Sequence, residues 1–127
     1  MKLEHVAINV PNAKALAQWL VDNLGMRMVV VNDVPPYMHF VADEAGSMLE
    51  IYTNPVAEMP DYTNMHPVTL HLAFSSSNIE ADRDRLVAAG ASQIGEINVT
   101  PEGHKLAFFR GPDNVPVQLV QRSKPLI

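Results

Sequence analysis

The chain has 127 residues, a net charge of −5 at pH 7 and no cysteine. A chain of this length can bury about two thirds of its unfolded surface as one domain without disulfides or a structural metal. The lack of cysteine excludes thiolate metal ligands and a cysteine nucleophile. The acidic balance, without a lysine or arginine cluster, excludes nucleic acid and membrane as expected partners. No apolar run reaches about 18 residues and no signal peptide is recognisable, so we expect a soluble cytoplasmic protein.

The first half of the chain combines one helix pattern with four strand patterns. Residues 3–10 alternate with the period of a half-buried strand. A helix is predicted at 13–25, with Asn12 as its N-cap and Gly25 as its stop signal. Three further strands are predicted, at 26–31, 37–43 and 47–53. The first half therefore has the order β-α-β-β-β.

The second half repeats this order after a proline-containing connector at 54–67. A strand is predicted at 68–75 and a helix at 78–90, with Ser77 and Glu80 as an S-x-x-E capping box. Three more strands are predicted, at 92–100, 105–110 and 115–121. The repeat predicts an α+β fold of two tandem βαβββ modules, whose mixed sheets enclose a cleft. We expect one domain made of module one (1–53), the connector (54–67), module two (68–122) and a tail (123–127).

Four polar residues occupy matching positions in the two modules. His5 and His71 fall on the first predicted strands, and Glu50 and Gln118 fall on the last. Each residue lies opposite the face whose aliphatic residues pack against the helix, so all four should point into the same cleft. Two imidazoles, one carboxylate and one amide oxygen suit a divalent first-row metal. Four protein ligands in an octahedral shell leave two positions for water or substrate.

A lone histidine or glutamate on a strand is usually structural or solvated, and the matched placement is what favours a site. Residues 3 to 122 also resemble the vicinal oxygen chelate superfamily, which includes glyoxalase I, extradiol dioxygenases and bleomycin-binding proteins. The resemblance rests on HVAINV and the helix ending in NLGM, on MLEIY, on HLAF and on FFRGPDNVPVQLVQ. It implies the glyoxalase-like fold, a small-molecule substrate and a homodimer. It also implies a divalent metal (Zn, Ni, Co, Mn or Fe) bound by His5, Glu50, His71 and Gln118.

The chain departs from the patterns of individual members of that superfamily. Many members carry glutamate where this chain has Gln118, and the extradiol pattern requires it. The glyoxalase I pattern often has arginine at the position of Asn9 and asparagine at the position of Asn54, so only the second matches. Asn9 and Asn54 are nevertheless candidate substrate-binding residues. Tyr52 joins them because it shares the strand face of Glu50.

The resemblance implies chemistry in which a metal chelates two neighbouring substrate oxygens and stabilises an enediolate. Glu50 can remove the adjacent C–H proton, whereas the amide of Gln118 does not titrate. We therefore predict a metal-dependent lyase or isomerase of the glyoxalase type with Glu50 as the catalytic residue. One alternative is a non-haem Fe(II) dioxygenase that uses His5, His71 and Glu50 as a 2-His-1-carboxylate set. The other is a drug-binding protein without catalysis.

Two further polar residues have more than one interpretation. Arg110 either meets an acidic substrate or pairs with an acid. His39 either lines the cleft or is a satisfied or exposed histidine on a strand.

Overall fold

The computed structural model describes every residue from Met1 to Ile127 and divides the chain into two compact units. The N-terminal unit is Met1–Asp61 and the C-terminal unit is Tyr62–Ile127. The boundary falls inside the predicted connector, so its first residues belong to one unit and its last residues to the other. The description of the chain as one domain stays a prediction.

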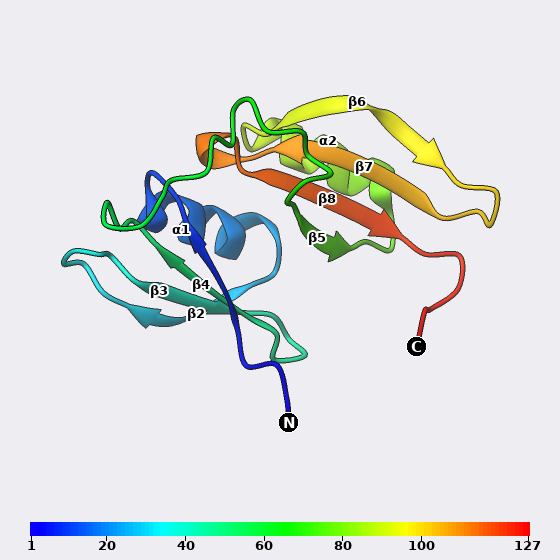
Figure 1. Cartoon of the computed structure of the whole chain (residues 1–127). Coiled ribbons are helices and arrows are strands. Elements are labelled where there is room, and N and C mark those ends of the chain that lie inside the picture. Colours follow the sequence, from blue (N-terminus) through cyan, green and yellow to red (C-terminus); the bar gives the residue numbers. More distant parts are fainter. The chain divides into compact units, whose positions relative to one another are not determined.

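The N-terminal unit consists of one helix and a four-stranded sheet (Figure 1). Its elements are β1 (Val6–Asn9), α1 (Ala13–Asn23), β2 (Arg27–Val31), β3 (His39–Ala42) and β4 (Met48–Tyr52). The strand order is β1-β4-β3-β2, with β1 parallel to β4 and the other pairs antiparallel. Helix α1 packs on one face of this sheet, where Leu16, Leu20, Val41 and Ile51 are fully buried.

The C-terminal unit repeats this topology (Figure 1). Its elements are β5 (Leu72–Ser75), α2 (Ile79–Ala88), β6 (Ser92–Val99), β7 (Lys105–Arg110), the short 3₁₀ helix η1 (Pro112–Asn114) and β8 (Pro116–Gln121). The strand order is β5-β8-β7-β6. Its core contains Ile79, Leu86, Phe109 and Val117. The predicted fold of two βαβββ modules is confirmed.

The first strand of each unit is shorter than predicted. β1 begins at Val6 and β5 at Leu72, so His5 and His71 each lie one residue before a strand, not within it. The alternating apolar residues before β5 misled the prediction, because Val68 and Leu70 are 62% and 37% exposed and belong to a turn that follows Pro67. The backbone N–H of Thr69 donates to the oxygen of His66 at 2.9 Å, so the chain turns here and the pairing of β5 starts after the turn.

The two helices begin in the same way, and one predicted cap is wrong. Asn12 caps α1 as predicted, since its side chain accepts a hydrogen bond from the backbone N–H three residues later (3.1 Å). In α2 the same bond is made by Asn78, also at 3.1 Å, and the predicted capping box of Ser77 and Glu80 does not form. Glu80 instead pairs with Lys105 of β7 at 2.6 Å. An asparagine is as good an N-cap as a serine, so Asn78 takes the position that the sequence motif gave to Ser77.

Replacing Asn78 with alanine is expected to lower the free energy of unfolding by about 1 kcal/mol, because one N–H in the first turn of α2 loses its acceptor. Ser77→Ala should change it by only a few tenths of a kcal/mol, and Asn12→Ala should resemble Asn78→Ala. Urea denaturation followed by circular dichroism measures all three. A larger loss for Ser77→Ala than for Asn78→Ala would contradict this assignment of the cap.

The last strand of each unit also supports its helix. The hydroxyl oxygen of Thr53, just after β4, accepts from the backbone N–H of Ala13 at 2.9 Å. At the matching place, the side-chain oxygen of Gln121 in β8 accepts from the backbone N–H of Ile79 at 2.8 Å. The first turn of each helix is therefore hydrogen-bonded to the residue that lies three positions after Glu50 or Gln118 in the sequence.

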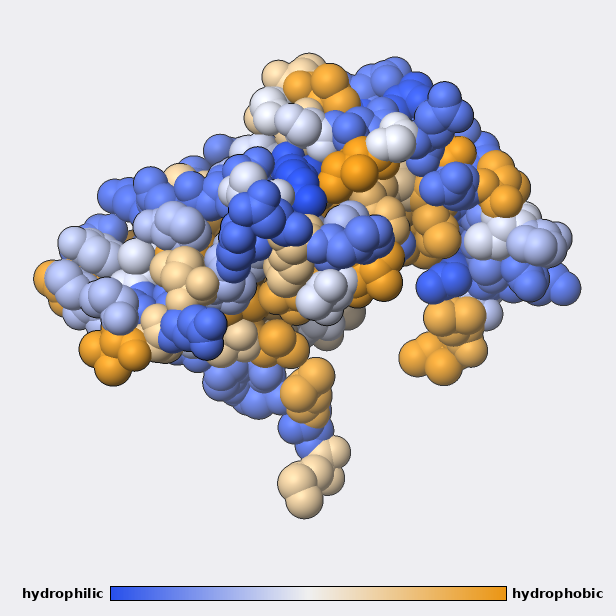
Figure 2. Space-filling model, turned by 45° about the horizontal axis from the view of Figure 1, so that its top comes forward, coloured by the Kyte–Doolittle hydropathy of each residue, from blue (hydrophilic) through white to orange (hydrophobic).

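The exposed surface is mixed in polarity. On the face drawn in Figure 2, hydrophilic residues surround separate groups of hydrophobic ones. Among the exposed apolar side chains are Met1 and Ile127 at the termini and Val29 to Val31 on the edge strand β2. None of the helices has the length and apolar character needed to cross a membrane.

Candidate functional site

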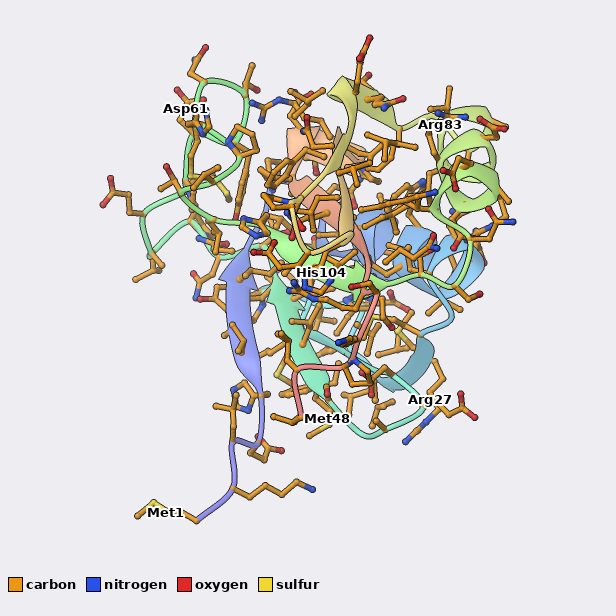
Figure 3. The ribbon with its side chains drawn as sticks, turned by 90° about the vertical axis from the view of Figure 1, so that its right-hand side faces the viewer. Met1, Arg27, Met48, Asp61, Arg83 and His104 are labelled. Atoms are coloured by element: carbon orange, nitrogen blue, oxygen red, sulfur yellow. The ribbon has the colours of Figure 1, made fainter.

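In the N-terminal unit, His5 and Glu50 meet on the sheet face that α1 leaves open. Glu50 lies two residues after Met48, which marks the start of β4 in Figure 3, and it is flanked in sequence by the fully buried Ile51 on the helix side. The Nε2 atom of His5 is 3.1 Å from a carboxylate oxygen of Glu50. Both side chains are accessible, with 34% and 21% of their surface exposed.

The second ring nitrogen of His5 is held by its neighbour in sequence. Nδ1 donates to the carboxylate of Glu4. With the proton on Nδ1, the Nε2 atom of a neutral imidazole is an acceptor, and it faces another acceptor on Glu50. This pair is favourable only when a positive charge lies between the two atoms. The hydrogen bond to Glu4, with a smaller contribution from Glu50, accordingly raises the pKa of His5 above its usual value, against the effect of desolvation.

A divalent cation fits this pair as well as a proton does. Two ligand atoms that lie about 2.1 Å from one cation, at right angles to each other, are about 3.0 Å apart. The 3.1 Å between His5 Nε2 and Glu50 Oε2 matches that spacing. A carboxylate bonded to the other ring nitrogen is also the usual support of a metal-binding histidine, and Glu4 provides it.

In the C-terminal unit, His71 and Gln118 occupy the equivalent positions. His71 Nδ1 donates to the backbone oxygen of Pro67 at 2.9 Å, which leaves Nε2 with its lone pair. Gln118 lies opposite Ala73 of β5 and Phe108 of β7 in the sheet. The half-buried amide of Gln118 makes no hydrogen bond with other residues, so its oxygen is available to a ligand.

Each histidine also contacts a phenylalanine that the sequence analysis missed. The ring of His5 is 5.3 Å from that of Phe40 with an angle of 81° between their planes, and the ring of His71 is 5.1 Å from that of Phe108 at 86°. Phe40 pairs with Glu50 across β3 and β4, and Phe108 pairs with Gln118 across β7 and β8. Strand alternation alone could place Phe40 and Phe108 on a sheet face. Only the strand register shows that they lie opposite Glu50 and Gln118.

Each unit thus carries one half of the predicted ligand set. His5 and Glu50 are in contact in the N-terminal unit, and His71 and Gln118 share one sheet face in the C-terminal unit. No three histidine, aspartate or glutamate side chains gather as a metal centre. A centre that contains all four predicted ligands requires both units and stays a prediction.

The candidate substrate-binding asparagines are engaged with the backbone after β4. Asn9 is only 6% exposed, and its side-chain nitrogen donates to the carbonyl groups of Asn54 (2.9 Å), Ala57 (3.3 Å) and Glu58 (3.4 Å). Its oxygen accepts from the N–H of Asn54 at 2.9 Å. Tyr52, in register with Asn9, is half-buried on the face of Glu50. Asn9 therefore fixes the chain that leaves this face, and contact of the three residues with substrate stays a prediction.

Arg110 has a structural role that neither sequence interpretation included. Its guanidinium donates to the backbone oxygens of Tyr62, Met65 (3.0 Å) and Asn114 (3.3 Å). It therefore ties the first residues of the C-terminal unit to the end of β7.

His39 is also placed differently from either interpretation. It is 1% exposed and lies in register with the buried Ile51, on the helix side of the sheet and not on the open face. Its Nδ1 donates to the backbone oxygen of Tyr37 at 2.7 Å, but its Nε2 is buried without a partner. The prediction of a satisfied or exposed histidine was wrong on both counts.

The sequence places the chain in a known superfamily. The model of the Glyoxalase/Bleomycin resistance protein/Dioxygenase superfamily matches residues 2–119. The chain therefore belongs to this superfamily, as the resemblance in its motifs had indicated. Among proteins with curated functions, none matches the chain.

Solved structures similar to this chain include proteins with different described roles. A glyoxalase family protein from Bacillus cereus has 17% identity and a TM-score of 0.78, covering 95% of this chain and 93% of its own. TnmS3, an antibiotic binding protein from Streptomyces sp. CB03234, has 24% identity and a TM-score of 0.70, covering 97% and 99%. The fosfomycin resistance protein FosX from Listeria monocytogenes has 15% identity and a TM-score of 0.73, covering 97% and 94%. At these identities the similarity shows the fold.

Proposed function

We propose that the chain is a divalent-metal-dependent enzyme of the lyase or isomerase type, which moves a proton on a small substrate with two neighbouring oxygens. The observation that carries this proposal is the 3.1 Å approach of His5 Nε2 to Glu50, with the other ring nitrogen bonded to Glu4. Such a pair of acceptors favours a cation between them. We also propose, from the superfamily, that the enzyme is a homodimer.

The residues that would hold the metal are His5, Glu50, His71 and Gln118. When bound, the divalent ion would supply Lewis acidity to the two substrate oxygens. Glu50 is the only titratable group of the four besides the imidazoles, and it is accessible on the open sheet face. We assign it the role of accepting the proton from the substrate carbon. Gln118 offers an oxygen without charge, so it can bind but not remove a proton.

Titration of the metal-free protein with Zn²⁺, Ni²⁺, Co²⁺, Mn²⁺ or, anaerobically, Fe²⁺ is expected to show about one bound ion per chain. His5→Ala and His71→Ala should each weaken binding by at least about a hundredfold, because loss of a ligand should exceed the tenfold to hundredfold effect of its outer partners. Calorimetry measures the affinity. His66→Ala removes an exposed histidine of the connector and should leave binding unchanged.

The same metal-loaded protein should exchange carbon-bound protons of dihydroxyacetone with D₂O, which proton NMR follows. Absence of metal binding, or binding that does not depend on His5 and His71, would overturn the proposal. Oxygen uptake with a catechol and Fe²⁺, without proton exchange, would replace the proposal with the dioxygenase.

A further inference from the structure

The two site histidines share two kinds of contact. One contact is an oxygen that accepts from Nδ1, from Glu4 for His5 and from Pro67 for His71. The other is a phenylalanine ring that stands nearly perpendicular to the imidazole. A hydrogen bond at Nδ1 alone still leaves the imidazole some rotation about its Cβ–Cγ bond. A perpendicular aromatic ring restricts this rotation, because the edge-to-face arrangement is the preferred one.

The phenylalanines are placed to act on both candidate ligands of their unit. Phe40 is the cross-strand neighbour of Glu50, and Phe108 is that of Gln118. Side chains that are directly opposite on one face of an antiparallel pair are in contact range. Each ring therefore stands beside the histidine and beside the carboxylate or amide of the same unit.

Ordinary core packing does not explain these two rings. Phe108 is half-buried, whereas its neighbour Phe109 is completely buried on the helix side of the same strand. Phe40 is likewise half-buried, next to the buried Val41. The same contact occurs at matching positions of two units, on the open face in both cases.

We propose that Phe40 and Phe108 are positioning residues. Phe40 fixes the ring orientation of His5, whose Nε2 faces Glu50, and Phe108 fixes that of His71, which shares its sheet face with Gln118. The inference rests on the proposed function for its consequence, since the oriented nitrogens are the candidate metal ligands. The ring orientation itself is a property of the metal-free protein and can be tested without metal.

The test compares Phe40→Leu and Phe108→Leu with the ring-retaining variants Phe40→Tyr and Phe108→Tyr. Phe74→Leu is the matched control, because Phe74 is half-buried on β5 but lies in register with Leu119 on the helix side. Relaxation of the ring ¹³C signals of His5 and His71, measured by NMR in the metal-free protein, reports ring motion. We expect increased motion of the corresponding histidine in each leucine variant only.

Competition titration with Zn²⁺ and a chelator provides the second measurement. The leucine variants should bind Zn²⁺ about tenfold to a hundredfold more weakly, with the tyrosine and Phe74→Leu variants within about threefold of the unsubstituted protein. Urea denaturation verifies that each variant is folded. Unchanged ring relaxation in the leucine variants would overturn the inference. A chain that binds no Zn²⁺ but shows the expected ring motion would support the inference while the proposed function fails.

Discussion

Replacement of Glu50 with glutamine is expected to lower the rate of proton exchange on dihydroxyacetone by at least about a hundredfold. The reason is that a positioned general base contributes roughly 10²-fold to 10⁴-fold, and an amide cannot replace it. Glutamine keeps the size and the oxygen of the side chain, so the contact with Phe40 across β3 and β4 should persist. Proton NMR in D₂O, with the metal-loaded protein, measures the rate.

The repeated architecture offers a matched control for this experiment. The double variant Glu50→Gln with Gln118→Glu moves the carboxylate from the N-terminal to the C-terminal unit at constant net charge. We expect metal binding to be retained, while exchange stays low if proton removal depends on position 50. Recovery of the full exchange rate in the double variant would show that any carboxylate in the set suffices. Full activity of the single Glu50→Gln variant would refute the assignment of Glu50 as the base.

The largest expected effect on stability is that of Arg110→Met. The guanidinium of Arg110 donates to three backbone oxygens, and Tyr62, which supplies one of them, is 3% exposed. Loss of the charged donor leaves the part-buried oxygens of Tyr62 and Met65 without this partner, which should lower the free energy of unfolding by about 3 kcal/mol. Methionine keeps an apolar stem of similar length, so the loss is assigned to the hydrogen bonds.

Urea denaturation measures this loss, and amide hydrogen exchange should locate it in β7, β8 and residues 62–65. Arg110→Lys should recover only part of the stability, because an ammonium lacks the planar fork of donors. Arg83→Met is the control, since Arg83 lies at the outer side of α2 (Figure 3) and pairs with the adjacent Asp84. A loss for Arg110→Met no greater than that of Arg83→Met would contradict the structural role of Arg110.

The sequence was sufficient to predict the order of elements and the strands on which Glu50 and Gln118 lie, whereas His5 and His71 lie one residue before the strands to which they were assigned. Strand alternation placed Glu50 and Gln118 on the open faces, because the residues on both sides of each are apolar, and Ile51, Val117 and Leu119 among them are buried. The start of β5 was not predictable in the same way, because Val68 and Leu70 imitate the strand pattern within a turn.

Interactions with the backbone were the least predictable part of the site. Arg110 binds carbonyl oxygens, which every residue has, so no particular partner is marked in the sequence. The same holds for Asn9 and the chain after β4. The contacts of Phe40 and Phe108 with the histidines depend on strand register, which alternation alone does not give.

The hydrogen bonds of Thr53 and Gln121 with the first turns of α1 and α2 also help to fix the register of β4 and β8. A slip of β4 or β8 by one residue would turn Glu50 or Gln118 from the open face toward the helix. The same slip would carry Thr53 or Gln121 away from the helix N–H that it serves. A misplaced ligand would therefore also cost the first turn of a helix one of its hydrogen bonds, which favours the register that puts Glu50 or Gln118 on the open face.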